Sequence, residues 1–297
     1  MNQIEIRGSA VKVYLRPLRH LVLLSSLCAA VACDDRQPAP PFHADYDAGP
    51  PAPLSCIPNL DGKIDANELL PALGVAEHLL VSPAGQDRPV NVEGKVDAQG
   101  RFVWDEASDV ASDQIATIMA VPVTSKWYAG FFPGAKFTAP FDAGGRVDAV
   151  YANDASSIRL LGLASPTENP PEGKTLLIYA APVVLFQFPL TPGLTYTSIG
   201  QTTNATVRGL PYAGKDTYDV KVDGAGTLTL PEFTFTQALR VRTSVTVEPA
   251  AGAKTSRKQV SFLFECFGEV MRATSKDNEP NDNFTIASEV RRLTAAR

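Results

Sequence analysis

Strand-like apolar runs recur along much of the chain, and in the clearest of them hydrophobic and polar side chains alternate with the two-residue period of β-strands. The clearest run is Leu239–Val247, in which Leu, Val and Thr alternate with Arg, Ser and Thr. Such a run predicts an antiparallel strand with one buried face and one face in water. Further strands are predicted over Val90–Val96, Arg101–Trp104, Gln114–Pro122, Trp127–Phe132, Arg146–Tyr151, Ile158–Leu163, Thr175–Phe188, Thr195–Thr197, Ala205–Val207, Thr217–Val222, Gly226–Leu230 and Lys258–Phe267.

Turn signals separate these runs and indicate the fold class. Asp223-Gly224, Ala225-Gly226 and Gly144-Gly145 are typical of hairpin turns. Many short strands joined in this way favour a mainly β protein, and the natural solution is an antiparallel β-sandwich. We place this β-sandwich domain at residues 91–274.

The segment before it, residues 55–90, has a different pattern. Within Asn67–Leu80, leucines recur at helical spacing, but Pro71 and Gly74 interrupt the run. One or two short helical turns are therefore predicted here.

The N-terminus carries an export signal. Four basic residues precede Leu21–Ala32, an apolar run that ends in small residues, as in a secretory signal peptide. A membrane-spanning anchor is the alternative, although such a helix needs about 20 apolar residues. The sequence Ala30-Val31-Ala32-Cys33 resembles the lipobox of bacterial lipoproteins. That resemblance implies removal of residues 1–32 and lipidation of Cys33, with plain cleavage after Ala32 as the alternative.

The resemblance also implies a location and a partner. The mature protein would be exported and anchored by its lipid to the bacterial cell envelope. The outer membrane or the cell surface is favoured over the inner membrane as the site of the anchor. Residues 33–54 are rich in proline and poor in aliphatic side chains. They predict a disordered tether that holds the folded part away from the membrane.

Four cysteines occur in the sequence. Cys28 would leave with the signal peptide and Cys33 would carry lipid. Cys56 and Cys266 then remain as an even pair in an oxidising compartment, which predicts a disulfide between them. Two buried free thiols are the alternative.

One motif has the spacing of a metal site. Residues 57–68 resemble the twelve-residue loop of EF-hand and dockerin proteins, with Gly62 at the sixth position. The resemblance implies a Ca²⁺ site formed by Asn59, Asp61, Lys63 (through its carbonyl), Asp65 and Glu68. Ile57 stands where the first ligand, an aspartate, is usual. The alternative is an Asp-Gly turn before a short helix that Asp65 or Asn67 caps.

Two further resemblances concern the last third of the chain. Tyr218–Arg242 resembles a stretch of secreted, uncharacterised β-rich bacterial proteins, which implies export and β structure. Asn278–Val290 resembles the opening of bacterial pre-peptidase C-terminal domains, although only seven residues follow it. We assign residues 275–297 to a C-terminal tail, with a short surface segment as the alternative interpretation.

Charge and composition exclude several functions. The first 32 residues hold four of the 27 basic and one of the 32 acidic side chains, so the remainder carries 23 − 31 = −8. An acidic chain without a basic patch is a poor nucleic-acid binder. The chain has three histidines and lacks HExxH, GxSxG and phosphate-loop motifs. These absences disfavour zinc proteases, serine hydrolases and nucleotide-binding enzymes.

The remaining candidates are a binding protein and an acidic hydrolase. We predict a non-enzymatic binding or structural role at the envelope, with an unknown protein or glycan as partner. Trp127 and Tyr128 are the candidate ligand face, and burial in the sandwich core is the alternative for them. The alternative function is a secreted hydrolase with an acidic or calcium-assisted site.

Overall fold

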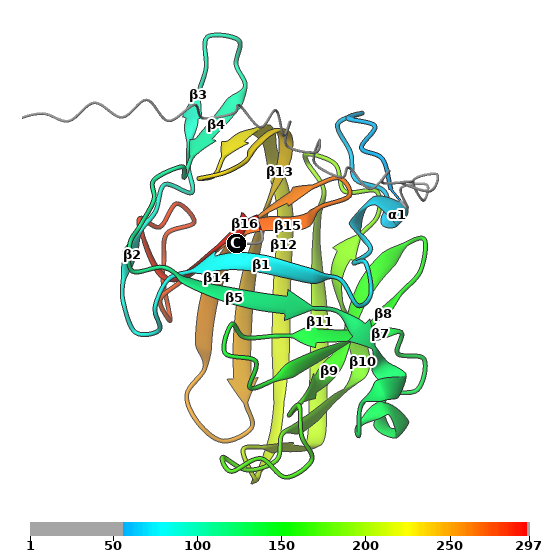
Figure 1. The fold of residues 1–297 in the computed structure, drawn as a ribbon. Coiled ribbons are helices and arrows are strands. Elements are labelled where there is room, and N and C mark those ends of the chain that lie inside the picture. The colour runs from blue at the N-terminus through cyan, green and yellow to red at the C-terminus, as the bar shows by residue number, and fades with distance from the viewer. Residues whose placement is uncertain (1–55, 296–297) are drawn as a thin grey trace, which may run out of the picture. The chain divides into compact units, whose positions relative to one another are not determined.

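A computed structural model describes residues 56–295, which lie in one compact unit spanning residues 53–297. Its strands join into a single mainly antiparallel sheet (Figure 1). The predicted β class is therefore confirmed. The shape differs slightly from two packed sheets, because one continuous sheet curls until it is nearly closed. Within the described residues, no helix is long and apolar enough to span a membrane.

Most of the sheet is an up-and-down run in which each strand pairs with the next in sequence. It contains β6 (Val121–Pro122), β7 (Phe137–Pro140), β8 (Asp148–Asn153), β9 (Ser157–Ala164), β10 (Leu176–Gln187), β11 (Thr195–Val207), β12 (Leu210–Thr229), β13 (Thr234–Pro249), β14 (Thr255–Phe264), β15 (Gly268–Ser275) and β16 (Ile286–Thr294).

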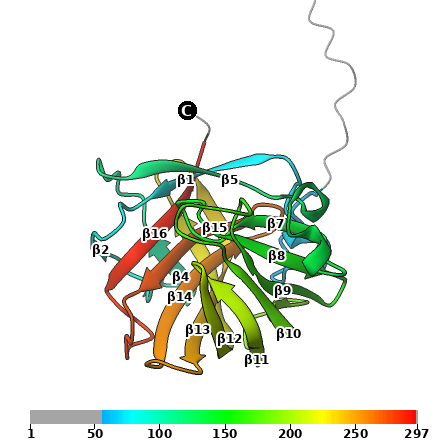
Figure 2. The ribbon, with the colours of Figure 1, turned by 90° about the horizontal axis from the view of Figure 1, so that it is seen from below.

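Two early strands complete the path and bring its ends together. β1 (Ala76–Val81) pairs with β16, and β5 (Gln114–Met119) pairs with β1. The path thus begins at β5 and ends at β6, and Ala120 alone separates these strands in the chain. Figure 2 shows β1 and β5 across the interior from β11–β14. Short strands β2 (Arg88–Pro89), β3 (Lys95–Val96) and β4 (Phe102–Asp105) attach beside this path.

Apolar side chains pack on both faces of the sheet. The inner cluster contains Leu160, Val220, Leu239 and Leu263. An outer cluster around Trp104 and Phe262 covers β13–β16, and another around Tyr128 covers β8 and β9. Burial on both faces explains why few strands show clean alternation in sequence.

The glycines near residue 224 do not form the predicted hairpin turns. Gly224 and Gly226 lie inside the 20-residue strand β12, beside two register shifts. β4 runs parallel to β12 there, and a Cβ on Gly226 would lie 2.1 Å from the carbonyl oxygen of Phe102. Glycine is needed here because the backbone of another strand approaches too closely for a side chain, as is common at glycines beside β-bulges. Gly144 and Gly145 do lie in the loop between β7 and β8, as predicted.

The predicted segment boundaries also need correction. The predicted helical segment Asn67–Leu80 is helical only where it overlaps α1 (Ala66–Leu69). The residues from Ala76 onward belong to strand β1. Residues 286–294, assigned to a tail, form β16 between β1 and β15. Both segments thus belong to the same sheet as residues 91–274. β1 lacks β-branched residues except Val81, so its strand depends on pairing with distant partners.

One predicted strand is absent and another is shortened. Trp127–Phe132 contains the 3₁₀ turn η2 (Ala129–Phe131) and follows another, η1 (Val123–Ser125). There Tyr128 and Phe132 pack edge to face with ring centroids 6.0 Å apart. Val90–Val96 forms a strand only at Lys95–Val96, while Val90 and Val92 cover the outer cluster.

Candidate functional site

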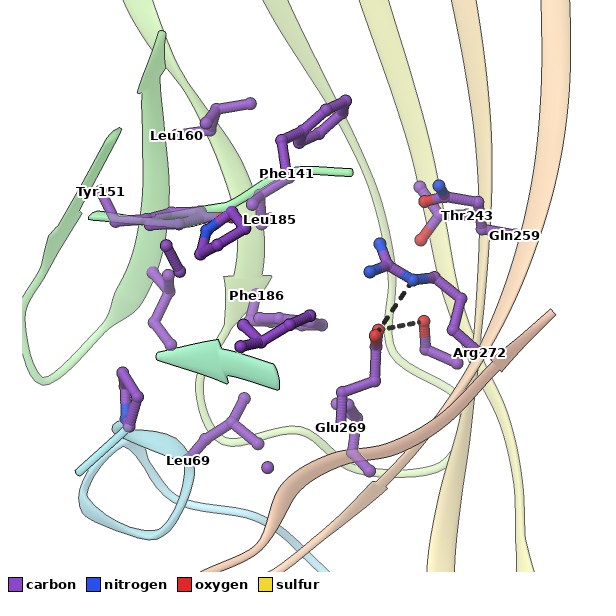
Figure 3. Close-up of a pocket in the computed structure, with 18 of the residues that line it drawn as sticks. Leu69, Phe141, Tyr151, Leu160, Leu185, Phe186, Thr243, Gln259, Glu269 and Arg272 are labelled. Carbon is purple, nitrogen blue, oxygen red and sulfur yellow. Dashed lines mark hydrogen bonds and ion pairs between the residues drawn. The ribbon is translucent and has the colours of Figure 1, made fainter. Parts of the chain in front are cut away.

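The curled sheet encloses a cavity of about 770 Å³. Side chains from β7–β10 and β12–β16 line it, and β1, β5, α1 and several connecting loops contribute the rest. A cavity of this size accepts a small organic molecule. Figure 3 shows that one wall is apolar and that the wall facing it carries polar groups.

The apolar wall comes mainly from β8, β9, β10 and the β7–β8 loop. Figure 3 shows Tyr151, Leu160, Leu185, Phe186 and Phe141 on this side. Burial raises the pKa of Tyr151 to about 12, so its hydroxyl stays neutral at physiological pH. Phe141 is 39% exposed, and Leu70, Val75 and Phe267, which line the same cavity, are more exposed still. The cavity therefore offers apolar surface from its buried interior out to exposed positions.

The polar wall comes from β13, β14 and β15. Arg272 Nε lies 3.0 Å from Glu269 Oε1, an ion pair without the alignment of a hydrogen bond. Glu269 Oε2 accepts a hydrogen bond of 2.7 Å from the hydroxyl of Ser261. Thr243 and Gln259 lie on the same wall (Figure 3). This wall can orient a polar group of a bound molecule without adding net charge, because Arg272 and Glu269 neutralise each other.

Two more carboxylates line the cavity. Glu77 on β1 has its pKa raised, first by burial and second by the negative charge of Glu269. Asp216 on β12 is buried, and its Oδ2 accepts a hydrogen bond of 2.5 Å from the hydroxyl of Tyr179. Burial raises the pKa of Asp216, and the hydrogen bond from Tyr179 opposes that shift.

The EF-hand-like loop is held by bonds among its own predicted ligands. Glu68 is buried; its Oε1 accepts from Asn59 Nδ2 at 2.7 Å and its Oε2 from the backbone amide of Asp65 at 2.8 Å. Lys63 Nζ forms ion pairs with Asp65 at 2.5 Å and Asp61 at 3.5 Å. Asp65 is the N-cap of α1, as the turn-and-cap alternative requires. Within residues 56–295, no group of three or more His, Cys, Asp or Glu side chains is arranged for a metal.

A thermal melt tests the calcium binding that the EF-hand resemblance implies for this loop. We expect the full chain to melt at the same temperature in millimolar Ca²⁺ and in chelator, because Glu68 and Asn59 already bind each other. A calcium-dependent rise of about 2–4 °C would contradict this expectation. Asp61→Asn is the control, since it removes an exposed carboxylate and should abolish any such rise.

Trp127 and Tyr128 do not form the open ligand face considered from the sequence. Tyr128 is fully buried, and its hydroxyl bonds Asp148 at 2.7 Å and Thr138 at 2.9 Å. Trp127 is partly buried and donates its ring N–H to the carbonyl of Ser165 at 2.8 Å. Both rings pack on the outer face of β8 and β9, so they agree with the alternative interpretation, in which these residues belong to the hydrophobic core.

The predicted disulfide joins Cys56 to Cys266, with Cα atoms 5.5 Å apart. It fixes the start of the described chain to the turn between β14 and β15, beside the cavity-lining Phe267. Glu265 strengthens this attachment, because its carboxylate accepts from the backbone amides of Asn59 and Leu60. Cys33 and the predicted signal peptide and tether lie outside the described residues.

Comparison with protein-family models, with curated proteins and with solved structures found no match. The cavity itself is therefore the feature that points to a function. Sequence reasoning did not find its polar residues. A usable signal was nonetheless present. Asp216 lies on the same face of its strand as the apolar Val220 and Val222, and a charged residue on a buried face is unusual.

Proposed function

We propose that this chain is a lipid-anchored protein of the cell envelope whose folded part binds a small amphipathic molecule inside the curled sheet. The observation that carries the proposal is the cavity of about 770 Å³ with one apolar and one polar wall. Binding pockets typically combine a large apolar lining with a few convergent polar groups. The proposal replaces an exposed aromatic face by an interior site, and it keeps the predicted non-enzymatic role.

A fluorescent apolar probe tests this function directly. N-phenyl-1-naphthylamine should bind the full chain with enhanced fluorescence. Thr243→Phe places a ring into the cavity from β13, and we expect the affinity to fall by about tenfold or more, because overfilled apolar sites lose space and contacts. Thr246→Phe is the matched control on the outward face of the same strand and should leave the affinity unchanged. Equal affinity in both variants would exclude the cavity as the site.

The anchor is tested separately in the bacterium that makes the protein. An alkyne analogue of palmitate should label the wild type and fail to label Cys33→Ser, because the cysteine sulfur is the predicted site of diacylation. The variant should also be found in the soluble envelope fraction, since stable anchoring needs more than one acyl chain. Equal labelling of the two proteins would end the lipoprotein interpretation and leave the binding proposal standing.

A secreted acidic hydrolase is the second candidate, and one observation favours it. Glu77 and Glu269 line the same cavity in different environments: burial raises the pKa of Glu77, whereas Glu269 is paired with Arg272. Acid–base hydrolysis uses two carboxyl groups that differ in this way. Release of nitrophenol from aryl glycosides, lost in Glu77→Gln, would support this candidate over simple binding.

A further inference from the structure

The charged side chains that line the cavity do not cancel. They are the carboxylates of Glu77, Asp216, Glu269 and Asp277 and the guanidinium groups of Arg257 and Arg272. Arg272 pairs with Glu269, and Arg257 pairs with Asp277. Within residues 56–295, no basic side chain forms an ion pair with Glu77 or Asp216. The lining therefore carries an excess of negative charge whenever these two carboxyls are ionised.

Asp216 is the more deeply buried of the two. Its side chain lies on the inner face of β12 and the residue keeps 8% of its surface exposed. Oδ2 is bonded to Tyr179, but Oδ1 is buried without a hydrogen-bond partner in the structure. Burying such an oxygen without a partner is unfavourable, and more so when the group is charged. A group retained at this cost is a strong candidate for ligand contact.

The backbone around Asp216 makes room for aromatic rings. Gly200, its partner on β11, has no Cβ, and an added Cβ would lie 2.5 Å from Cδ1 of Tyr179. A Cβ on Gly214 would lie 2.6 Å from the hydroxyl oxygen of Tyr212. Tyr218, two residues after Asp216 on the same face, is also buried and lies next to Tyr179. Two glycines thus allow tyrosine side chains to gather beside one carboxylate.

We propose that the cavity takes an amphipathic organic cation, with its ammonium group beside the carboxylate of Asp216 among these tyrosines and its apolar part along Leu160 and Leu185. Aromatic rings attract ammonium groups through the negative faces of their π systems, and the carboxylate supplies the opposite charge. A bare Ca²⁺ ion is less suited, because it requires six to eight oxygen ligands. The inference rests on the proposed binding function and names its ligand class.

Protonation of Asp216 gives the site a pH dependence. The residues paired with Asp216 are Gly200 on β11 and Val247 on β13, which carry no charge. Tyr179 and Tyr218 face it from β10 and β12, and burial raises the pKa of both above its usual value. Tyr212 on β12 also interacts with its charge, and Arg257 on β14 is held by Asp277. Affinity for a cation should therefore fall as acid neutralises Asp216.

Three probes with one tail and different head groups test the proposal on the full chain. Each of n-decyltrimethylammonium, n-decanol and n-decanoate would displace N-phenyl-1-naphthylamine. We expect the cation to bind about tenfold more tightly than the alcohol, and the anion to bind more weakly than both. Asp216→Asn should bring the cation to within about twofold of the alcohol, whose own affinity should not change. Asp219→Asn, the outward control on β12, should behave as the wild type.

The outcomes separate the two proposals. Equal affinities of wild type for the three probes, or an unchanged cation preference in Asp216→Asn, would overturn the ammonium site. Failure of the alcohol to displace the dye would instead overturn the cavity-binding function. If Asp216→Asn does not fold, the wild type decides alone. Because burial raises the pKa of Asp216, the preference for the cation over the alcohol must decrease as the pH is lowered from about 8 to about 4, the ordinary pKa of an aspartate carboxyl.

Discussion

Replacing both Cys56 and Cys266 by serine is expected to lower the free energy of unfolding by as much as about 5 kcal/mol. The bridge closes a loop with a sequence separation of 210 residues, and the chain-entropy model gives about that value for such a loop. Because typical domains are stable by only about 5–15 kcal/mol, this change removes a large part of the total. Urea unfolding monitored by tryptophan fluorescence measures the loss.

The reduced wild type is the control for the disulfide prediction. With a thiol reductant present, the wild type should unfold at the same urea concentration as the double variant, because both then lack the constraint on the unfolded chain. A loss below about 1 kcal/mol in the double variant would contradict the prediction. Such a small loss would mean that hydrogen bonds keep residues 56–68 on the β14–β15 turn without the disulfide. One of them is the 2.7 Å bond from the Cys266 amide to the Glu68 carbonyl.

Substitution of Asp113 by alanine is expected to cost about 3–5 kcal/mol, because it leaves two largely buried arginines without a carboxylate partner. Asp113 is 5% exposed at its side chain and pairs with Arg88 and with Arg292, the latter at 2.7 Å. Arg292 also donates to the carbonyls of Glu106 at 2.6 Å and Ser108 at 2.7 Å. These bonds hold the segment between β4 and β5 against β16.

An exposed ion pair serves as the matched control for Asp113→Ala. Asp87 pairs with Lys276 at 2.6 Å, with more than half of each side chain exposed. Asp87→Ala should therefore cost less than about 1 kcal/mol. Thermal unfolding of the two variants in one buffer compares them. Similar small losses would show that Arg292 finds solvent or another partner, and that β16 is not fixed by this cluster.

The β class was predictable because alternation survives where a strand has one wet face. Leu239–Val247 shows the pattern, and the structure contains that strand as part of β13. β1 was not predictable, because Leu79 and Leu80 fit helical spacing equally well and the choice depends on pairing with residues near 291–294. Long-range pairing leaves no local trace in the chain.

The cavity was harder to predict than the fold. Glu77, Asp216, Glu269 and Arg272 come from β1, β12 and β15, and only closure of the sheet brings them to one interior. The segment with recognisable spacing, Asn59–Glu68, instead bonds to itself. A local motif search favours residues close in sequence, whereas this site depends on register across many strands.

Intermolecular nuclear Overhauser effects between a bound decyl chain and the protein test the central claim most directly. With the full chain and n-decanol, the account predicts contacts from the alkyl protons to the methyl groups of Leu160 and Leu185, which line the cavity. These contacts should disappear in Thr243→Phe and persist in Thr246→Phe. Contacts confined to exposed apolar side chains such as Ile199 and Leu210, with none to Leu160 or Leu185, would contradict it.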